Sequence, residues 1–428
     1  MPLMIIFLAY QILWCFALPF FVIVMLYRHF IMHKQSDIKQ RVGWIPQPPH
    51  QKKVIWLHAV SVGEVLSLEH VIKRIKETIP NACCYVTTGT EGGKKMALSR
   101  LNADYVSYLP FDFIICTWLA FVRIHPHALI IIEAELWPNL LMLAHIRNVP
   151  IYTINARISD RSAPRYHRFS FLLRPLLQCI THFYVQQPAD KKKFMALGCK
   201  ASKIDIMGNI KICNVLDKKE LYAPIPQTQQ DHLVMLVGSL HPGEAQIYVN
   251  VFTRLKETNK HLKLLLVPRH LTWTSQLEAM LKATPFRYTL WTPHDTHSIN
   301  DLDATMATCD ILAIAKLGML FELYAYADLF FLGGTFVPVG GHNLMEPAIW
   351  QLPAIVGPYH HNCTHEVTAL REKEGVVVAL TEQALYATTI KMVTDHDYRK
   401  KIGQHAHQWL VDNSTAVDAV LTNLLQKL

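Results

Sequence analysis

Short apolar runs alternate with segments of helical periodicity along most of this 428-residue chain. In its first half, the runs that predict strands are KVIWLHAV, ACCYVTT, YVSYLPF, ALIIIEAE, VPIYTIN, HFYVQQ and KIDIMGNI. Between the first two, one helical face carries Val65, Leu68, Ile72, Ile75 and Ile79. This alternation predicts βαβ units and a parallel sheet covered by helices on both faces.

The alternation breaks at a polar stretch with two prolines and then starts again. The later runs that predict strands are HLVMLVGS, LKLLLVPRH, DILAIAK, LFFLGG, LPAIVGP and VVVAL. We therefore predict two tandem doubly wound α/β domains, whose ligands bind beyond the carboxyl ends of the strands. The predicted boundaries are 36–212 and 231–400, with an irregular linker at 213–230 and a helix at 401–428 that packs back across the junction.

The N-terminus carries no charged side chain over its first 26 residues. A helix needs ~20 apolar residues to span a bilayer, so we predict an uncleaved anchor over residues 1–30. An anchor embedded in one leaflet is the alternative. A cleaved signal peptide is not expected, because it would begin with charged residues and this sequence does not. Four basic residues, Arg28, Lys34, Lys39 and Arg41, follow at once and predict a cytoplasmic body on the inner membrane.

Composition limits the classes of partner that this protein is expected to bind. The net charge is +9, which beside an anchor favours an anionic membrane or a phosphorylated lipid. No zinc-finger spacing, RNP-like run or long basic tract occurs, so nucleic acid is not an expected partner. Nine cysteines without a CxxC pair fit a reducing compartment.

Polar residues gather where the predicted strands of the first domain end. Glu64 follows Ser61 and Gly63 at the first strand-to-helix junction, where a capping box is the purely structural interpretation. Glu133 and Glu135 are predicted on one strand face, with a structural salt bridge to Arg157 as the alternative. The remaining acceptor-side candidates are Thr88, Gly89, Thr90 and Asn155.

The second domain repeats this arrangement with residues suited to an anionic ligand. Small residues and helix starts after strands favour close backbone approach to a phosphate, and Arg can grip it at two points. The candidates are Ser239, His241, Arg269, His270, Gly340, Gly341, His342, Asn343 and Glu346. The glycine loop does not match GxGxxG, and no HExxH occurs, so neither a dinucleotide cofactor nor a metal ion is expected.

These stretches, in this order, resemble the transferases of 3-deoxy-D-manno-oct-2-ulosonic acid (Kdo). The residues that carry the resemblance are WLHAVSVGE, VTTGT, ELWPN, NAR, GNIK, GSLHPGE, VPRH, GGHNLMEPA and GP. The resemblance implies a GT-B fold with its active site in the interdomain cleft, CMP-Kdo as donor, a lipid A precursor as acceptor, and neither metal nor cofactor. It also implies that Glu64 is the general base and that Lys211 lies near the donor.

One segment departs from the family pattern, which usually reads Asp-Thr-x-Gly-Glu-Leu before the LYAYAD helix. Here residues 315–320 read AKLGML, so both acids are missing and Lys316 is a possible substitute. This departure is the only support for one alternative, a membrane-bound sugar-nucleotide binder without turnover. A second alternative, a sugar-nucleotide epimerase, rests on the shared GT-B architecture.

Overall fold

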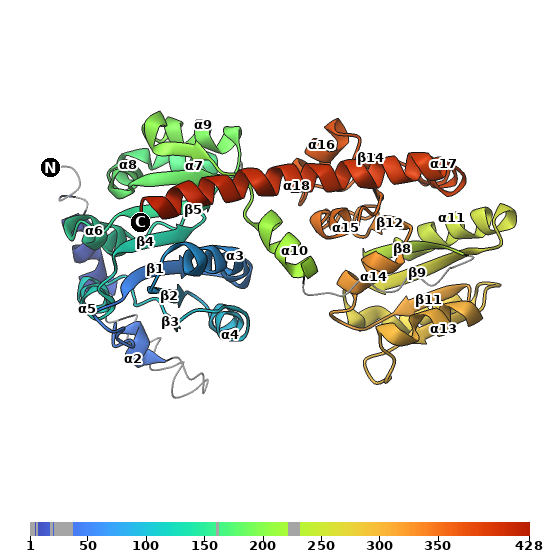
Figure 1. The fold of residues 1–428 in the computed structure, drawn as a ribbon, viewed down its shortest axis with the longest axis horizontal. Coiled ribbons are helices and arrows are strands. Elements are labelled where there is room, and N and C mark those ends of the chain that lie inside the picture. The colour runs from blue at the N-terminus through green and yellow to red at the C-terminus, as the bar shows by residue number, and fades with distance from the viewer. Residues whose placement is uncertain (1–4, 6, 18–19, 21–36, 160–161, 221–231) are drawn as a thin grey trace. The chain divides into compact units, whose positions relative to one another are not determined.

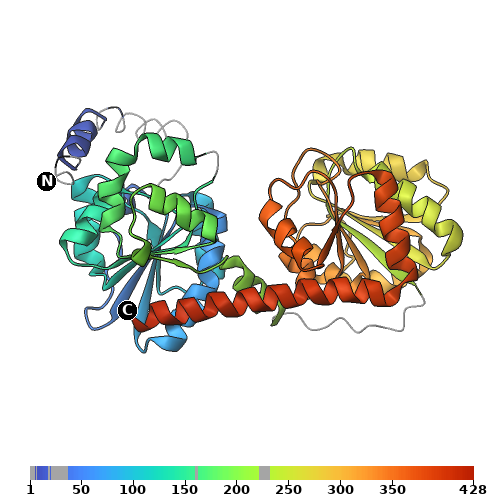
Figure 2. The ribbon, with the colours of Figure 1, turned by 90° about the horizontal axis from the view of Figure 1, so that it is seen from above.

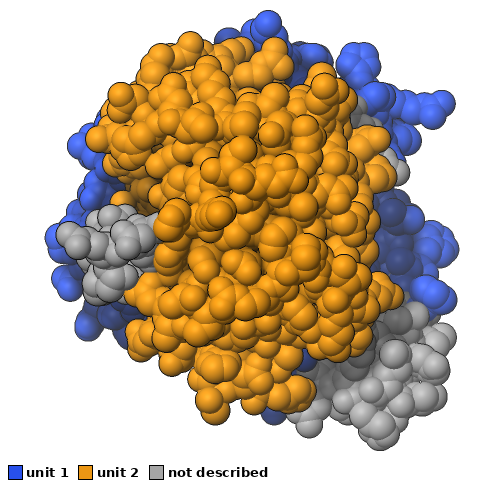
Figure 3. Space-filling model, turned by 90° about the vertical axis from the view of Figure 1, so that its right-hand side faces the viewer, with its two compact units in different colours: residues 1–214, 413–428 blue, residues 215–412 orange. Residues whose placement is uncertain are grey.

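The computed structural model describes residues 5, 7–17, 20, 37–159, 162–220 and 232–428 (Figure 1). The chain divides into two compact units, coloured separately in Figure 3. Unit 1 comprises residues 1–214 and 413–428, and unit 2 comprises residues 215–412. Each unit is a doubly wound α/β body with its own seven-stranded sheet.

Unit 1 has one strand at each of the seven positions predicted in the first half of the chain. Its strands are β1 (Lys53–Ala59), β2 (Ala82–Thr88), β3 (Tyr105–Tyr108), β4 (Ala128–Ile132), β5 (Ile151–Ala156), β6 (His182–Val185) and β7 (Ile204–Ile206). Its helices are α2 (Ile38–Arg41), α3 (Val62–Thr78), α4 (Glu91–Arg100), α5 (Ile114–Ile124), α6 (Pro138–Ile146), α7 (Ala163–Arg168), α8 (Ser170–Cys179), α9 (Pro188–Ala196) and η1 (Ala201–Lys203). The predicted helical face of α3 is buried against the sheet.

Unit 2 repeats the plan with one strand more than predicted. Its strands are β8 (Leu233–Leu240), β9 (Leu262–Pro268), β10 (Tyr288–Trp291), β11 (Ile311–Ile314), β12 (Leu329–Leu332), β13 (Ala354–Val356) and β14 (Val376–Val378). Its helices are α11 (Ala245–Thr258), η2 (Leu271–Trp273), α12 (Thr274–Lys282), η3 (Ile299–Asp301), α13 (Leu302–Thr308), α14 (Leu320–Tyr326), α15 (Met345–Ile349), α16 (Thr364–Glu372) and α17 (Glu382–Thr394). The additional strand is β10, an edge strand of four residues that has only one fully buried side chain.

In each sheet the chain adds strands first on one side of its first strand and then on the other, so the strand order reverses beside that strand. Unit 1 has the order β3-β2-β1-β4-β5-β6-β7, and unit 2 has the order β10-β11-β9-β8-β12-β13-β14. All the pairs are parallel, and helices cover both faces of each sheet (Figure 2). Ligands of such sheets bind at the carboxyl edge beside the reversal. That edge lies after β1 and β4 in unit 1, and after β8 and β12 in unit 2.

Two helices belong to both units. The first is α10 (Lys211–Glu220), and the division falls between Asn214 and Val215. The prediction of an irregular linker from 213 is therefore wrong up to residue 220. The second is α18 (His396–Gln426), whose residues from 413 onward pack within unit 1. One such contact is the ion pair of Asp418 on α18 with Arg74 on α3, in which Oδ1 lies 2.8 Å from Nε.

The predicted membrane anchor lies mostly outside the described residues, since residues 1–4, 6, 18–19 and 21–36 are not among them. Residues 7–17 are helical, and the Tyr10 hydroxyl donates a hydrogen bond to Asp112 Oδ2 at 3.0 Å. In the part of the chain that the structure describes, no helix is long and apolar enough to cross a membrane.

The end of α18 should be an integral part of the core of unit 1. Leu421 is completely buried in one of its two apolar clusters. The Leu421→Ala variant should lower the free energy of unfolding of unit 1 by roughly 2–5 kcal/mol, because it leaves a cavity. Chemical denaturation followed by fluorescence measures this. Asn423→Ala, at an exposed position two residues further on, should change it by under about 0.5 kcal/mol; equal effects would contradict the assignment.

Candidate functional site

Glu64 is held rigidly at the turn that leads from β1 into α3. Its Oε2 accepts a hydrogen bond from the Val60 amide at 2.8 Å. Its Oε1 accepts from the Ser61 amide at 3.2 Å and from the Ser61 hydroxyl at 2.6 Å. Ser61 in turn accepts from the Glu64 amide, which completes the expected capping box. The structural interpretation of this motif is therefore correct, and Glu64 as a whole residue is only 9% exposed.

Glu133 and Glu135 do not share a strand face as predicted, because β4 ends at Ile132. Glu133 adopts a left-handed conformation with φ of 62°, which ends the strand alternation. Arg157 does pair with it, at 3.5 Å. Burial raises the pKa of Glu135, and the negative charges of Glu64 and Glu133 raise it further. The three carboxylates thus form one electrostatic group at the carboxyl edge of the sheet.

The other first-domain candidates shape the edge around this group. The Thr90 hydroxyl donates to the Val60 carbonyl at 3.1 Å and caps α4. Thr88 donates to the carbonyl of Thr90, and a Cβ at Gly89 would lie 2.7 Å from Val60. These three residues therefore position the β1–α3 turn. By contrast, nothing lies within 4 Å of a Cβ built at Gly63.

Asn155, at the end of β5, is fully buried in a left-handed conformation with φ of 58°. Its Oδ1 accepts a hydrogen bond from the Ile210 amide at 3.2 Å. Its Nδ2 has no hydrogen-bond partner among the described residues. Strained backbone combined with an unsatisfied buried donor is typical of a functional site.

Unit 2 contains a polar cavity of about 430 Å³ at the carboxyl edge of its sheet. Its lining residues are Ser239, Arg269, Leu320, Tyr324, Gly341, His342, Asn343, Glu346 and Asn362. Six of these nine are predicted donor-side residues. The other three are not among the predicted site residues: Leu320 and Tyr324 follow β11, in and just after the divergent segment, and Asn362 follows β13 and carries no local motif.

The remaining predicted donor residues lie around the cavity or away from it. The His241 ring stacks on His342 and meets His270 edge-on, with centroids 5.7 Å apart in both pairs. Gly340 donates to the Gly334 carbonyl at 2.9 Å. Lys211 is different, since it belongs to unit 1 and is not among the lining residues.

Glu346 lies on α15 and Asn343 does not, because the helix begins at Met345. Asn343 precedes the helix, and its Oδ1 accepts a hydrogen bond from the Met345 amide at 2.8 Å. Glu346 lies in the first turn and pairs with Lys218 at 3.5 Å.

Burial lowers the pKa of His241 and of His342, and the charge of Arg269 contributes to both shifts. Both imidazoles are therefore expected to be neutral near pH 7 and able to donate a hydrogen bond. The Nε2 atoms of both have no partner among the described residues. Within that same part of the chain, no group of three or more His, Cys, Asp or Glu side chains could hold a metal ion.

The buried carboxylate of Glu244 ties together the two loops that line the cavity. Its Oε1 accepts from the His241 amide at 2.8 Å and from the Gly334 amide at 2.6 Å. Its Oε2 accepts from the Phe336 amide at 3.4 Å. Glu244 is completely buried, so these backbone donors provide the polar contacts that a buried charge requires. Glu244 is not among the predicted site residues, although HPGE after β8 resembles SVGE after β1.

The divergent segment at 315–320 reaches the cavity through Leu320. Lys316 is not among the lining residues; its ammonium group donates to the carbonyls of Asp295 at 2.6 Å and His297 at 2.7 Å. In this structure the Lys316 charge thus stabilises the loop after β10 and does not replace the missing acids at the donor cavity.

Comparisons with known proteins define the class. The chain matches the crystal structure of UDP-GlcNAc 2-epimerase from Neisseria meningitidis with a TM-score of 0.58, over 87% of this chain and 100% of that one. Sequence identity there is 12%, so the match shows the fold alone. Together with the two parallel sheets, it defines a GT-B-like two-domain α/β protein.

Sequence comparisons identify the family. The family model described as 3-deoxy-D-manno-octulosonic-acid transferase (kdotransferase) matches residues 36–214. The chain is 30% identical over 382 residues to a 3-deoxy-D-manno-octulosonic acid transferase of Haemophilus influenzae, covering 87% of this chain and 86% of that one. It is also 32% identical over 376 residues to a bifunctional glycosyltransferase/methyltransferase of Fusobacterium nucleatum, of which it spans 56%. The chain belongs to the Kdo transferase family and is a glycosyltransferase.

Replacing the Glu244 carboxylate should weaken donor binding. In Glu244→Gln, one carboxylate oxygen becomes an NH2 group that must face a backbone N–H donor, and charged hydrogen bonds worth about 1.5–3 kcal/mol are lost. We expect the KM for the Kdo donor to rise roughly tenfold to a hundredfold, with a smaller change in kcat. Steady-state kinetics at saturating acceptor measure this split.

The matched control is Asp328→Asn. Burial raises the pKa of the Asp328 carboxylate, as it raises that of Glu244, and Asp328 Oδ2 accepts a hydrogen bond from the Val234 amide at 2.9 Å at the opposite edge of the sheet. It should reduce thermal stability without changing the KM for the donor. A similar rise in KM in both variants would mean that Glu244 acts only through stability.

The carboxylate group of unit 1 predicts a directional pH effect. Glu133→Gln removes one negative charge that raises the pKa of Glu135, so that pKa should fall. If activity requires ionised Glu135, the acidic limb of the kcat/KM profile should then move to lower pH. Glu91→Gln, an exposed acid in the first turn of α4, should leave the limb in place. A shift to higher pH, or none, would argue against this electrostatic coupling.

Proposed function

We propose that this chain transfers Kdo from CMP-Kdo to a lipid A precursor, with inversion at the anomeric carbon and without a metal ion. An acceptor hydroxyl oxygen attacks that carbon, the bond to the phosphate oxygen breaks, and CMP leaves with the electron pair. The observation that carries the proposal is the presence of carboxylates at the sheet reversal of unit 1 and a cation-lined polar cavity at that of unit 2.

The cavity of unit 2 is our proposed CMP site. Arg269 can grip a phosphate through two parallel hydrogen bonds. The neutral His342 ring can donate a further hydrogen bond to it. Glu346 can accept hydrogen bonds from a ribose diol, and its partner Lys218 offsets the negative charge. Such preorganised donors stabilise the charge that develops on a departing phosphate.

Glu64 is our proposed general base. A carboxylate offers roughly four lone-pair sites, and three of those on Glu64 accept hydrogen bonds from Val60 and Ser61. One site is left for the acceptor hydroxyl, in a fixed direction. A carboxylate held at hydrogen-bond distance from the acceptor hydroxyl can take up its proton as the oxygen attacks the donor.

We further propose that the N-terminal segment holds the enzyme at the inner membrane, with its catalytic body in the cytoplasm. Within residues 7–17, the exposed fractions of Leu8, Leu13 and Phe16 are 54%, 62% and 80%. A helix with such a face suits the acyl boundary of a bilayer. The basic residues Arg28, Lys34 and Lys39 would then meet anionic headgroups.

The decisive variant is Glu64→Gln. Glutamine also serves in a capping box, so α3 should stay folded, but it cannot take up the proton. With CMP-Kdo and a lipid A precursor, kcat should fall by roughly 10²–10⁴. Mass spectrometry of the product measures transfer, and EDTA should leave the wild-type rate unchanged.

Glu69→Gln, a partly exposed position on the same helix, is the matched control and should retain wild-type activity. If Glu64→Gln keeps a normal rate, Glu64 is not the base. If the wild type transfers nothing but still binds CMP, the proposed acceptor or turnover is wrong.

A further inference from the structure

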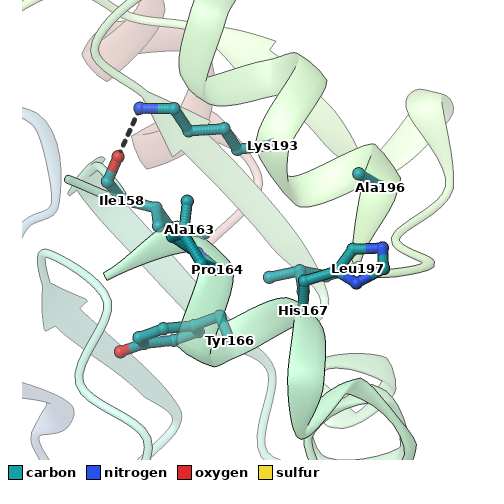
Figure 4. A pocket seen from close by; sticks show the side chains of 8 residues that line it. All are labelled: Ile158, Ala163, Pro164, Tyr166, His167, Lys193, Ala196 and Leu197. Carbon is teal, nitrogen blue, oxygen red and sulfur yellow. Dashed lines mark hydrogen bonds between the residues drawn. The ribbon is translucent and has the colours of Figure 1, made fainter. Parts of the chain in front are cut away.

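Unit 1 contains a second cavity, of about 280 Å³, between α7 and α9. Its wall is mostly aliphatic and aromatic, with side chains from Ile158, Ala163, Pro164, Tyr166, Ala196 and Leu197. Figure 4 shows α7 on one side of the cavity and α9 on the other. The Lys193 ammonium group also borders it, but donates to the Ile158 carbonyl at 2.6 Å (Figure 4). The cavity therefore suits an apolar ligand better than a polar one.

Tyr166 connects this cavity with the candidate carboxylates. Its ring lines the cavity and packs against the same apolar cluster as Leu136 and Trp137, which follow Glu135 in the chain. Burial raises the pKa of the Tyr166 hydroxyl, and the charge of Glu135 raises it further. One lining residue of the cavity therefore lies within reach of the charge of Glu135, one of the candidate carboxylates.

The surface around the cavity is apolar and basic. Residues 163–179 contain Arg165, Arg168, Arg174 and His167, but no Asp or Glu. Phe169 and Phe171 expose 46% and 68% of their surface. Exposed aromatic rings among cations complement an amphiphile that has hydrocarbon chains and a negatively charged headgroup.

We propose that this cavity binds an acyl chain of the acceptor lipid and thereby holds the acceptor sugar at Glu64 and Glu135. This inference rests on the proposed lipid acceptor and adds a subsite for its chain. Binding energy from a remote chain would position the reacting hydroxyl, which is how enzymes use non-reacting parts of a substrate.

Filling the cavity tests the proposal. Ala196 is exposed on α9 and lines the cavity, so Ala196→Trp should occupy it without disturbing the core. The KM for an acylated lipid A precursor should rise about tenfold, as loss of part of an apolar contact predicts. The KM for the same phosphorylated disaccharide without acyl chains should not change.

Met195→Trp is the matched control, because Met195 is 45% exposed on the same helix and is not among the lining residues. It should leave both KM values unchanged. Equal rises in both variants would indicate general contact with the bilayer, and no rise in Ala196→Trp would exclude the chain; either result overturns the proposal.

A readout independent of transfer separates this inference from the proposed function. A lipid A precursor with a diazirine in its acyl chain should label peptides containing Tyr166 or Leu197 in wild type and in Met195→Trp. Labelling should fall at least fivefold in Ala196→Trp. Labelling without Kdo transfer would leave the cavity assignment standing and refute the proposed function, whereas transfer without labelling would do the reverse.

Discussion

A glutamate that accepts backbone N–H groups just after the first strand organises each unit of this protein. In unit 1 the amide of Ser61 donates to Glu64, three residues further on, and in unit 2 the amide of His241 donates to Glu244 with the same spacing. Each interaction turns the chain from a strand into a helix at the sheet reversal, where the fold leaves room for a ligand. The two glutamates then differ in what surrounds them. Glu64 keeps one side open, whereas Glu244 is enclosed by a second loop.

This difference separates the roles of the units. Glu244 accepts hydrogen bonds from the amides of His241, Gly334 and Phe336, and so fixes the shape of the donor cavity. Around it, the neutral His241 and His342 rings leave Arg269 as the cation of the cavity lining. Because desolvation disfavours protonation of the two rings, an anion in the cavity meets a positive charge that comes from Arg269 and not from the histidines.

Unit 1 has the opposite electrostatics. Three carboxylates share one edge, and burial together with mutual repulsion raises the pKa of Glu135. Arg157 compensates Glu133 at 3.5 Å, while Glu64 is compensated by backbone and hydroxyl donors. The three carboxylates therefore share one edge of the sheet but differ in the groups that compensate them.

Residue order alone determined much of this. Apolar runs and helical spacing defined thirteen of the fourteen strands, because burial on both faces leaves a continuous apolar signal. The edge strand β10 lacks that signal, since most of its side chains are only partly buried. Local motifs also identified the capping box of Glu64 and six residues of the donor cavity.

Other features depend on contacts between segments distant in sequence, and only the tertiary structure decided them. Tyr324 and Asn362 enter the donor cavity from different βα units, and Glu244 acquires its role from Gly334, 90 residues away. Lys316 lies in the segment that lacks the two acids, but its ammonium group donates hydrogen bonds to two carbonyls of the loop after β10. Sequence spacing predicts which side chains share an element, but long-range packing determines which atoms meet and therefore what each charge does.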